Sequence, residues 1–202
     1  MEKAARDLLM IFYRNPRMGM VKTRLAATVG DHKALAVYVA LCRHTISVTE
    51  ILPFDKMVFY ADAVENDDMW PDEAYHKAAQ SGMDLGERMS NAFRAGFTAG
   101  YRSICIIGTD CYELTGAIIQ QAFEALHSYD AVIGPAEDGG YYLLGLRQLQ
   151  SELFIKKQWS TGSVFRETLE NFDSAGIRYL TLPLLRDVDV EDDLPSELRK
   201  LL

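Results

Sequence analysis

Basic residues cluster in a short stretch near the start of this acidic chain. The stretch RNPRMGMVKTRLA, residues 14–26, contains four cations, and no Asp or Glu occurs anywhere between residues 8 and 30. Lys, Arg and backbone N–H groups are the usual ligands of phosphate groups in proteins. Gly19 favours a tight loop, and a short helix is expected over 21–27, with Lys22 and Arg24 in its first turn. This pattern supports equally a phosphate site and a solvated basic loop paired with carboxylates of other segments.

Acidic residues follow apolar runs at three later points. Asp110 follows ICIIG, Asp138 follows AVIGPA, and Asp187 and Asp189 lie in RDVDVEDDL near the C-terminus. Carboxylates in such positions hold Mg²⁺ where the ion bridges phosphate oxygens. Each also has a purely structural interpretation: a helix cap for Asp110, a hairpin turn for Asp138, and the acidic first turn of the last helix for the C-terminal group.

Short apolar runs alternate with segments of helical periodicity, which predicts a single α/β domain over 1–202 with a mostly parallel sheet. The runs are continuous, as is typical of strands buried on both faces. Only EDGG separates AVIGPA from YYLLGL, too few residues for a parallel crossover, so the strand at 141–146 is expected to run antiparallel. Strands are expected at 8–13, 57–61, 104–108, 131–136, 141–146 and 177–182, and helical segments at 35–46, 85–97, 118–126 and 164–172.

Ligands of parallel α/β sheets bind beyond the carboxyl ends of the strands, because the loops and helix N-termini meet there. The basic stretch and the three acidic segments are therefore expected to converge at one edge of the sheet. The irregular span 61–89 is expected to be a long excursion that shapes one side of this site. Cations and carboxylates together suit a polyphosphate with a bound divalent metal.

Composition excludes several other classes of protein. A net charge of -8 disfavours nucleic-acid binding, and no apolar run reaches the roughly 18 residues of a membrane span. The N-terminus does not resemble a secretory signal, so a cytoplasmic location is expected. Three cysteines without a C-x-x-C pair argue against a disulfide framework and against a cysteine zinc site. Lys22 follows Val21 rather than Gly, and no G-x-G-x-x-G follows the first run, which excludes Walker A and Rossmann motifs. The sequence does not indicate an oligomeric state.

Six ordered segments resemble the signatures of the nucleotide-diphospho-sugar transferase superfamily, which has the glycosyltransferase-A fold. They are PRMGMVKTRL, MDLGERM, GTDCYEL, GPAEDGGYYLLGL, QWSTGSVFRET and DVDVEDDL, and together they extend over about 8–194. The chain is most similar to the small stand-alone bacterial branch related to the guanylyltransferases of 2-phospholactate and molybdenum-cofactor metabolism. The resemblance implies a three-layer sandwich of the glycosyltransferase-A type.

The resemblance also implies roles for individual residues. Asp138 is a candidate ligand or base on the acceptor side, and Arg88 meets either phosphate or the second substrate. Mg²⁺ or Mn²⁺ is the implied metal. The implied catalytic residues are Asp138 and Lys22; the nucleotide-binding residues are Arg14, Gly19, Lys22, Thr23, Arg24 and Arg88; the metal ligands are Asp110, Asp187 and Asp189; and the acceptor side is formed by Gly139, Gly140 and Tyr141.

The implied activity is transfer from a nucleotide-diphospho-sugar to a small-molecule acceptor. Nucleotidyl transfer from an NTP to a phosphorylated small molecule is the alternative, and a non-catalytic nucleotide-binding module is a third reading. Tyr112 stands where the branch usually has Pro, and Met83 replaces a Gly. The D-x-D motif of many glycosyltransferases is absent, which makes sugar transfer less certain than nucleotide binding.

Overall fold

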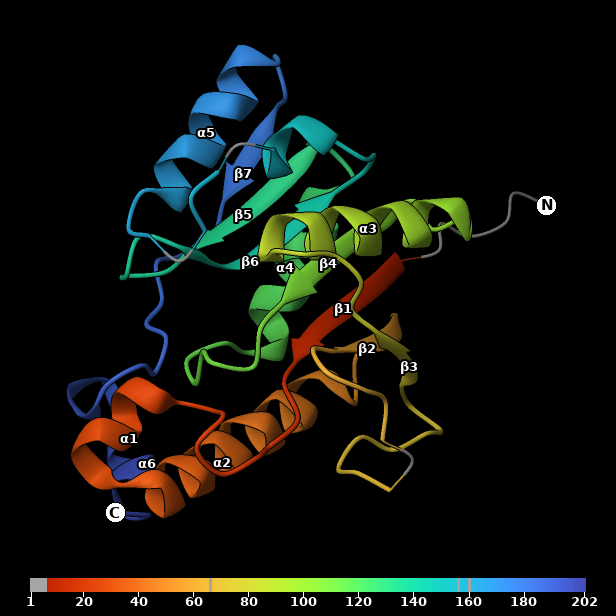
Figure 1. Ribbon diagram of the computed structural model, residues 1–202. Coiled ribbons are helices and arrows are strands. Elements are labelled where there is room, and N and C mark those ends of the chain that lie inside the picture. Colours follow the sequence, from red (N-terminus) through yellow and green to blue (C-terminus); the bar gives the residue numbers. More distant parts are fainter. Residues whose placement is uncertain (1–6, 66, 156, 160) are drawn as a thin grey trace.

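The computed structural model describes residues 7–65, 67–155, 157–159 and 161–202, which contain one seven-stranded sheet. The strand order is β3-β2-β1-β4-β6-β5-β7 (Figure 1). The strands are β1 Asp7–Tyr13, β2 Asp55–Tyr60, β3 His76–Ala79, β4 Ser103–Ile107, β5 Ala131–Pro135, β6 Tyr141–Leu146 and β7 Tyr179–Thr181.

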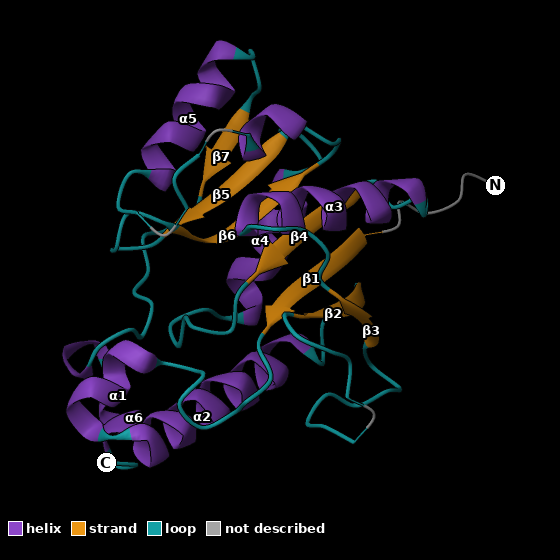
Figure 2. Ribbon diagram, in the orientation of Figure 1, coloured by secondary structure: helices purple, strands orange, loops and turns teal. Residues whose placement is uncertain are grey.

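Helices cover both faces of the sheet, which gives three layers (Figure 2). Helices α2 and α4 pack on one face, and α3 and α5 pack on the other. Within the described ranges, no helix has both the length and the apolar character needed to cross a membrane. The helices are α1 Thr23–Val29, α2 Asp31–Thr49, α3 Leu85–Thr98, α4 Gly116–Ala125, α5 Val164–Ser174 and α6 Ser196–Arg199, with short 3-10 helices η1 Ser151–Phe154 and η2 Glu191–Asp193.

Strand β1 lies at the centre of the sheet and is buried on both faces. Leu9 and Ile11 pack into the layer with α2 and α4, whereas Leu8 and Met10 pack into the layer with α3 and α5. Each such side chain contributes roughly 1.5–3 kcal/mol through burial. The continuous apolar run that opens the chain is therefore a doubly covered strand, as expected.

Strand β6 is antiparallel to both of its neighbours, β4 and β5, whereas the other strand pairs of the sheet are parallel. This confirms the orientation expected for 141–146. The turn before β6 contains Gly139, which has a φ of 86°. A Cβ atom at Gly139 would lie 2.2 Å from the carbonyl oxygen of Gly162, so both the backbone conformation and the packing require glycine.

Two local expectations were wrong. Strand β3 lies inside the excursion 61–89, where no strand was expected, because this edge strand has only four residues, none of them fully buried, and lacks an apolar run. The helix expected over 21–27 begins at Thr23, and Lys22 precedes it in a left-handed conformation with φ 48° and ψ 44°. Of the two cations placed in the first turn, only Arg24 lies there.

The C-terminal segment packs back onto α1 and α2. Val188, Leu194 and Leu198 form a buried cluster with Leu25 and Leu41. Helices α1 and α6 lie below and to the left of the sheet in Figure 1. Helix α6 begins only at Ser196, so the acidic group before it is not the first turn of the last helix. The cluster instead holds a loop with two aspartates beside α1.

Candidate functional site

A cleft of about 670 Å³ opens at the carboxyl ends of β1 and β4. The loop after β1, the start of α3, the start of β6 and the C-terminal acidic loop form its walls. The structure thus brings the basic stretch and the three acidic segments to one edge of the sheet. The predicted site residues that line the cleft are Arg14, Lys22, Thr23, Arg24, Arg88, Asp110, Asp138, Tyr141, Asp187 and Asp189.

Three predicted site glycines are not among the residues that line the cleft. Gly19 has a φ of 71° and lies in a turn in which the Met20 amide donates to the Arg17 carbonyl, 3.0 Å away. Gly139 and Gly140 form the turn before β6, where the Gly140 amide donates to Asp138 Oδ1 at 2.8 Å. The hairpin-turn interpretation of this carboxylate is therefore correct, and the same carboxylate also lines the cleft.

The Lys22 ammonium lies between two carboxylates at one end of the cleft. Its side chain is only 5% exposed, and Nζ lies 2.7 Å from Asp110 Oδ1 and 3.4 Å from Asp189 Oδ1. Burial alone lowers the pKa of this lysine, but the charges of Asp110, Asp189 and Asp187 outweigh burial and raise the pKa above its ordinary value. The left-handed backbone of Lys22 costs roughly 1–2 kcal/mol. Lys22 is therefore a strained, buried and fully charged residue.

Arg24 extends the same ion-pair network at the surface. Its Nη1 lies 3.2 Å from Asp189 Oδ2, and its side chain is 69% exposed. Lys22 and Arg24 thus pair with carboxylates of distant segments, although their own stretch contains none. The basic stretch is an ion-paired loop, and it also faces a cleft that can hold a ligand.

Asp187 carries the most perturbed carboxyl group of the cleft. Burial, followed by the negative charges of Asp110 and Asp138, raises the pKa of Asp187 to about 7, although Lys22 opposes the shift. Three carboxylates therefore share this region with one buried cation. The helix-cap interpretation of Asp110 does not hold, because Thr115 caps α4 through a hydrogen bond from the Ile118 amide.

The donor chemistry of this end suits a hard divalent cation. Asp110, Asp187 and Asp189 provide carboxylate oxygens, which are the ligands that Mg²⁺ and Mn²⁺ prefer. Over the described residues, however, no three His, Cys, Asp or Glu side chains are already grouped as a metal site. The ammonium of Lys22 instead neutralises two of these carboxylates.

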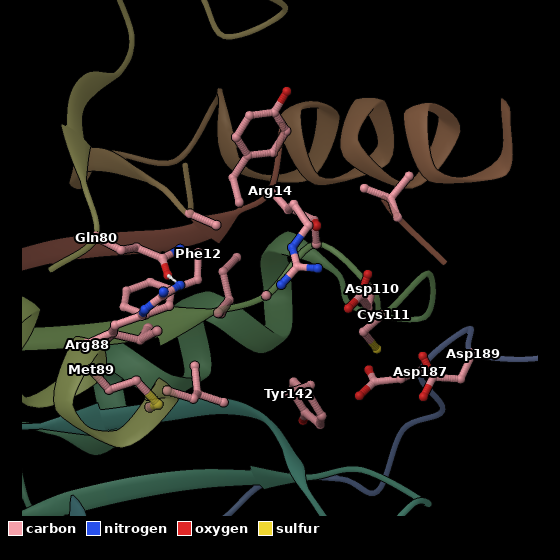
Figure 3. A pocket seen from close by; sticks show the side chains of 18 of the residues that line it. Phe12, Arg14, Gln80, Arg88, Met89, Asp110, Cys111, Tyr142, Asp187 and Asp189 are labelled. Atoms are coloured by element: carbon pink, nitrogen blue, oxygen red, sulfur yellow. Dashed lines mark hydrogen bonds between the residues drawn. The ribbon is translucent and has the colours of Figure 1, made fainter. Parts of the chain in front are cut away.

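Two arginines of the cleft have only neutral partners within the described ranges. Arg88 donates from Nε to the Gly82 carbonyl at 3.1 Å and from Nη1 to Gln80 Oε1 at 3.4 Å. Arg14 donates from Nη1 to the Met20 carbonyl at 3.3 Å. In Figure 3, Arg14 points into the middle of the cavity, and Arg88 lies at the end away from Asp110 and Asp187.

Apolar groups line the part of the cleft near Arg88. Phe12 and Met89 lie beside Arg88 and Gln80 in Figure 3, and Tyr141, the first residue of β6, also lines the cleft. The Tyr141 hydroxyl makes a weak contact of 3.7 Å with the Met89 sulfur. This end therefore offers ring faces and amide groups together with one guanidinium, whereas the other end is dominated by carboxylates.

Sequence reasoning missed several residues of the cleft. Gln80 directly follows β3, so recognising that strand would have placed it at the sheet edge. Thr109 and Tyr38 also line the cleft. Tyr38 lies in the helical segment expected over 35–46, but no pattern in the sequence shows which groups its hydroxyl contacts.

The structure accounts for the positions at which the sequence departs from the family signatures. Tyr112, in place of Pro, packs its ring against His44 with centroids 4.5 Å apart, and Asp110 beside it still faces the cleft. Met83 is 93% exposed at the rim. In the WST segment, Trp159 packs into the layer with α3 and α5, and Ser160 lies outside the described residues.

A solved structure that is 30% identical to the chain shows that it belongs among nucleotide-diphospho-sugar transferase-like proteins, and the fold is glycosyltransferase-A-like. The chain belongs to the family described as "Uncharacterized protein conserved in bacteria (DUF2064)", whose profile matches residues 45–161. That range includes Arg88, Asp110 and Asp138, but it excludes the basic loop and the C-terminal aspartates.

Solved structures resemble the chain over nearly its whole length. A candidate nucleotide-diphospho-sugar transferase from Desulfovibrio desulfuricans G20 is 30% identical, with a TM-score of 0.85, and the match covers 97% of this chain and 91% of that one. CMP:2-keto-3-deoxy-manno-octonic acid synthetase complexed with CTP shares the fold at 10% identity, with a TM-score of 0.59 and 98% coverage of both chains. Rv0371c from Mycobacterium tuberculosis H37Rv, complexed with manganese, is 11% identical, with a TM-score of 0.50 and 98% coverage of both chains. A search of the curated proteins gives no significant match.

Proposed function

We propose that this protein is a metal-dependent transferase that uses a nucleotide-diphospho-sugar as donor and a small molecule with a hydroxyl group as acceptor. The observation that carries this proposal is one cleft that combines the buried Lys22, the carboxylates of Asp110 and Asp187, and the guanidinium of Arg14. The 30% identity to a candidate nucleotide-diphospho-sugar transferase supports the class of donor.

In this proposal the nucleotide lies along the cleft. Arg14 and Lys22 bind the diphosphate. The guanidinium of Arg14 has no carboxylate partner within the described ranges, and the ammonium of Lys22 is already buried at the acidic end of the cleft. Arg88 and Gln80 contact the nucleoside at the other end, where Phe12 offers a ring face. Thr23 and Arg24 add contacts at the start of α1.

Asp110, Asp187 and Asp189 are the residues that would hold Mg²⁺ or Mn²⁺, since their oxygens suit these ions. When bound, the metal supplies positive charge that neutralises the diphosphate leaving group. Lys22 contacts two of these carboxylates and would therefore hold them in place beside the same phosphates.

The transfer step uses Asp138 as the base on the acceptor side. Its Oδ1 is fixed by the Gly140 amide, which orients the carboxylate in the turn before β6. The acceptor hydroxyl oxygen forms a bond to the anomeric carbon, and the bond from that carbon to the phosphate oxygen breaks. The electron pair leaves with the nucleoside diphosphate, and the hydroxyl proton passes to Asp138.

Nucleotidyl transfer is the second candidate, and the fold that the chain shares with CMP:2-keto-3-deoxy-manno-octonic acid synthetase complexed with CTP supports it. A buried ammonium 2.7 Å from Asp110 suits the α-phosphate of an NTP. A phosphate oxygen of the acceptor would then attack the α-phosphorus, the bridging bond to the β-phosphate would break, and pyrophosphate would leave with the electron pair.

The test incubates the full chain with Mg²⁺ or Mn²⁺ and a panel of nucleotide sugars and NTPs. Thermal shift measures binding, and release of nucleoside diphosphate or pyrophosphate measures turnover with a panel of hydroxyl and phosphate acceptors. Nucleoside diphosphate release supports glycosyl transfer, and pyrophosphate release supports nucleotidyl transfer. Binding without turnover supports a non-catalytic module. No metal-dependent nucleotide binding overturns both enzyme functions.

A further inference from the structure

The hydroxyl group of Tyr38 contacts two segments of the cleft at once. Tyr38 comes from α2, is 4% exposed, and lines the cleft. Its hydroxyl donates to the Arg14 carbonyl at 2.8 Å and accepts from the Arg14 amide at 3.1 Å. It also accepts from the Thr109 hydroxyl at 3.4 Å. These three contacts use the one donor and both acceptor positions of a phenol.

These contacts fall where both strands end. Arg14 is the first residue after β1, and Thr109 precedes Asp110 after β4. Strand pairing no longer fixes the backbone of Arg14 at this point, and one side-chain hydroxyl satisfies both of its main-chain polar groups. Burial raises the pKa of Tyr38 above its ordinary value, so the hydroxyl keeps its proton at neutral pH and remains a donor.

The chain of contacts continues into the C-terminal acidic loop. The Asp110 carbonyl accepts from the Val188 amide at 2.9 Å, and Val188 lies between Asp187 and Asp189. Tyr38 therefore joins the backbone of the cationic loop to Thr109 at the end of β4. The next residue, Asp110, joins the end of β4 to the C-terminal aspartates.

We propose that Tyr38 is a positioning residue that fixes the cation-bearing loop, at Arg14, relative to the carboxylate that follows β4, at Asp110. It does not touch the ligand through its hydroxyl, because the three contacts occupy that group fully. Its effect on ligand binding rests on the proposed function, whereas its effect on the two loops does not.

The test compares Tyr38→Phe with Tyr75→Phe. Tyr75 is equally buried in the same hydrophobic layer, but among the described residues its hydroxyl contacts only Thr49 and Ile46 of α2. Backbone hydrogen exchange is measured over residues 12–24 and 105–113 under conditions in which both variants are equally stable to denaturant. We expect exchange to be at least about tenfold faster in both segments for Tyr38→Phe, because this variant loses all three hydroxyl contacts and with them the partner of both main-chain polar groups of Arg14. We expect no change for Tyr75→Phe.

Binding of a nucleotide with Mg²⁺ is the second measurement. Tyr38→Phe is expected to weaken it about tenfold, and Tyr75→Phe to leave it unchanged. Thr109→Val, which removes only the weakest contact, is expected to speed exchange in 105–113 alone. Equal exchange in the two Tyr variants overturns the positioning role. If the wild-type chain binds no nucleotide, the proposed function fails, and the exchange result alone decides the role of Tyr38.

Discussion

The cations of the cleft fall into two groups with different partners. Lys22 and Arg24 form ion pairs with Asp110 and Asp189, whereas Arg14 and Arg88 contact only neutral groups within the described ranges. A paired cation is held in place, but its field is largely cancelled by its carboxylate. A cation with neutral partners keeps its charge available for an incoming anion. Cations that are held in a fixed position and cations with charge available for a ligand are therefore different residues of this site.

The largest effect is expected from Asp110→Asn, which removes the ion pair between Asp110 and Lys22. The substitution removes a metal ligand and the closest partner of Lys22 while keeping the shape of the side chain. We expect metal-dependent nucleotide binding to weaken by about a hundredfold or more, as measured by calorimetry. Chemical denaturation is the control for folding, which should change little because this carboxylate is partly exposed. Unchanged binding would show that the metal ligands lie elsewhere.

Arg14→Ala removes a cation that has no carboxylate partner within the described ranges. Its charge contributes to ligand binding without competition, so we expect nucleotide affinity to fall about tenfold. Arg17→Ala is the control, because Arg17 is also basic, lies in the same stretch, and pairs with Glu65 at 3.3 Å outside the cleft. If the two variants bind nucleotide equally well, availability of charge is not what distinguishes Arg14.

Arg24→Ala is expected to have a smaller effect. Because Arg24 is exposed and already paired with Asp189, its loss should weaken binding only about threefold at low salt. The difference from wild type should disappear as the ionic strength is raised to about 0.5 M. Titrations at several salt concentrations measure this. A loss as large as that for Arg14→Ala at every salt concentration would contradict the division into two groups.

Asp187→Asn tests whether the carboxylates around Lys22 destabilise the folded chain. The folded-state pKa of Asp187, about 7, lies above the ordinary value near 3.9, so ionisation destabilises the folded chain as pH rises from about 4 to 7. Asn has no such cost. We expect the metal-free variant to gain about 1–3 kcal/mol over wild type at pH 8 and little at pH 4.

Urea denaturation at both pH values measures this gain. Asp67→Asn, which removes an exposed carboxylate that does not line the cleft, is the control for the loss of one negative charge. A gain for Asp187→Asn that is equal at pH 4 and pH 8 would show that ionisation of this carboxyl group is not the cause.

Much of the fold could be predicted from local patterns. Doubly buried strands leave continuous apolar runs, and the four-residue connection before β6 permits only an antiparallel return. Strand β3 was not predicted, because an edge strand needs no apolar run when one side of it faces solvent. The residues that converge could also be predicted, because strand ends share one edge of a parallel sheet.

The pairing within the site could not be predicted. The contact of Lys22 with Asp189 joins residues 167 positions apart, and it depends on how the C-terminal loop packs on α1. The bond from Tyr38 to Arg14 depends on the distance between a helix and a strand end, which periodicity does not encode. Side-chain hydrogen bonds of this kind follow from tertiary packing and leave no local signature.

The reversed strand β6 has a consequence for how this scaffold can diversify. Since β5 and β6 are joined by a hairpin, the side of the cleft that we propose binds the acceptor is a short turn and not a loop that leads into a helix. Residues in this turn can be exchanged, or the turn lengthened, without altering any crossover connection of the parallel sheet. A library confined to residues 137 and 140 would therefore sample new acceptor preferences at little risk to the fold, with Asp138 kept as the proposed base and Gly139 kept for its backbone conformation.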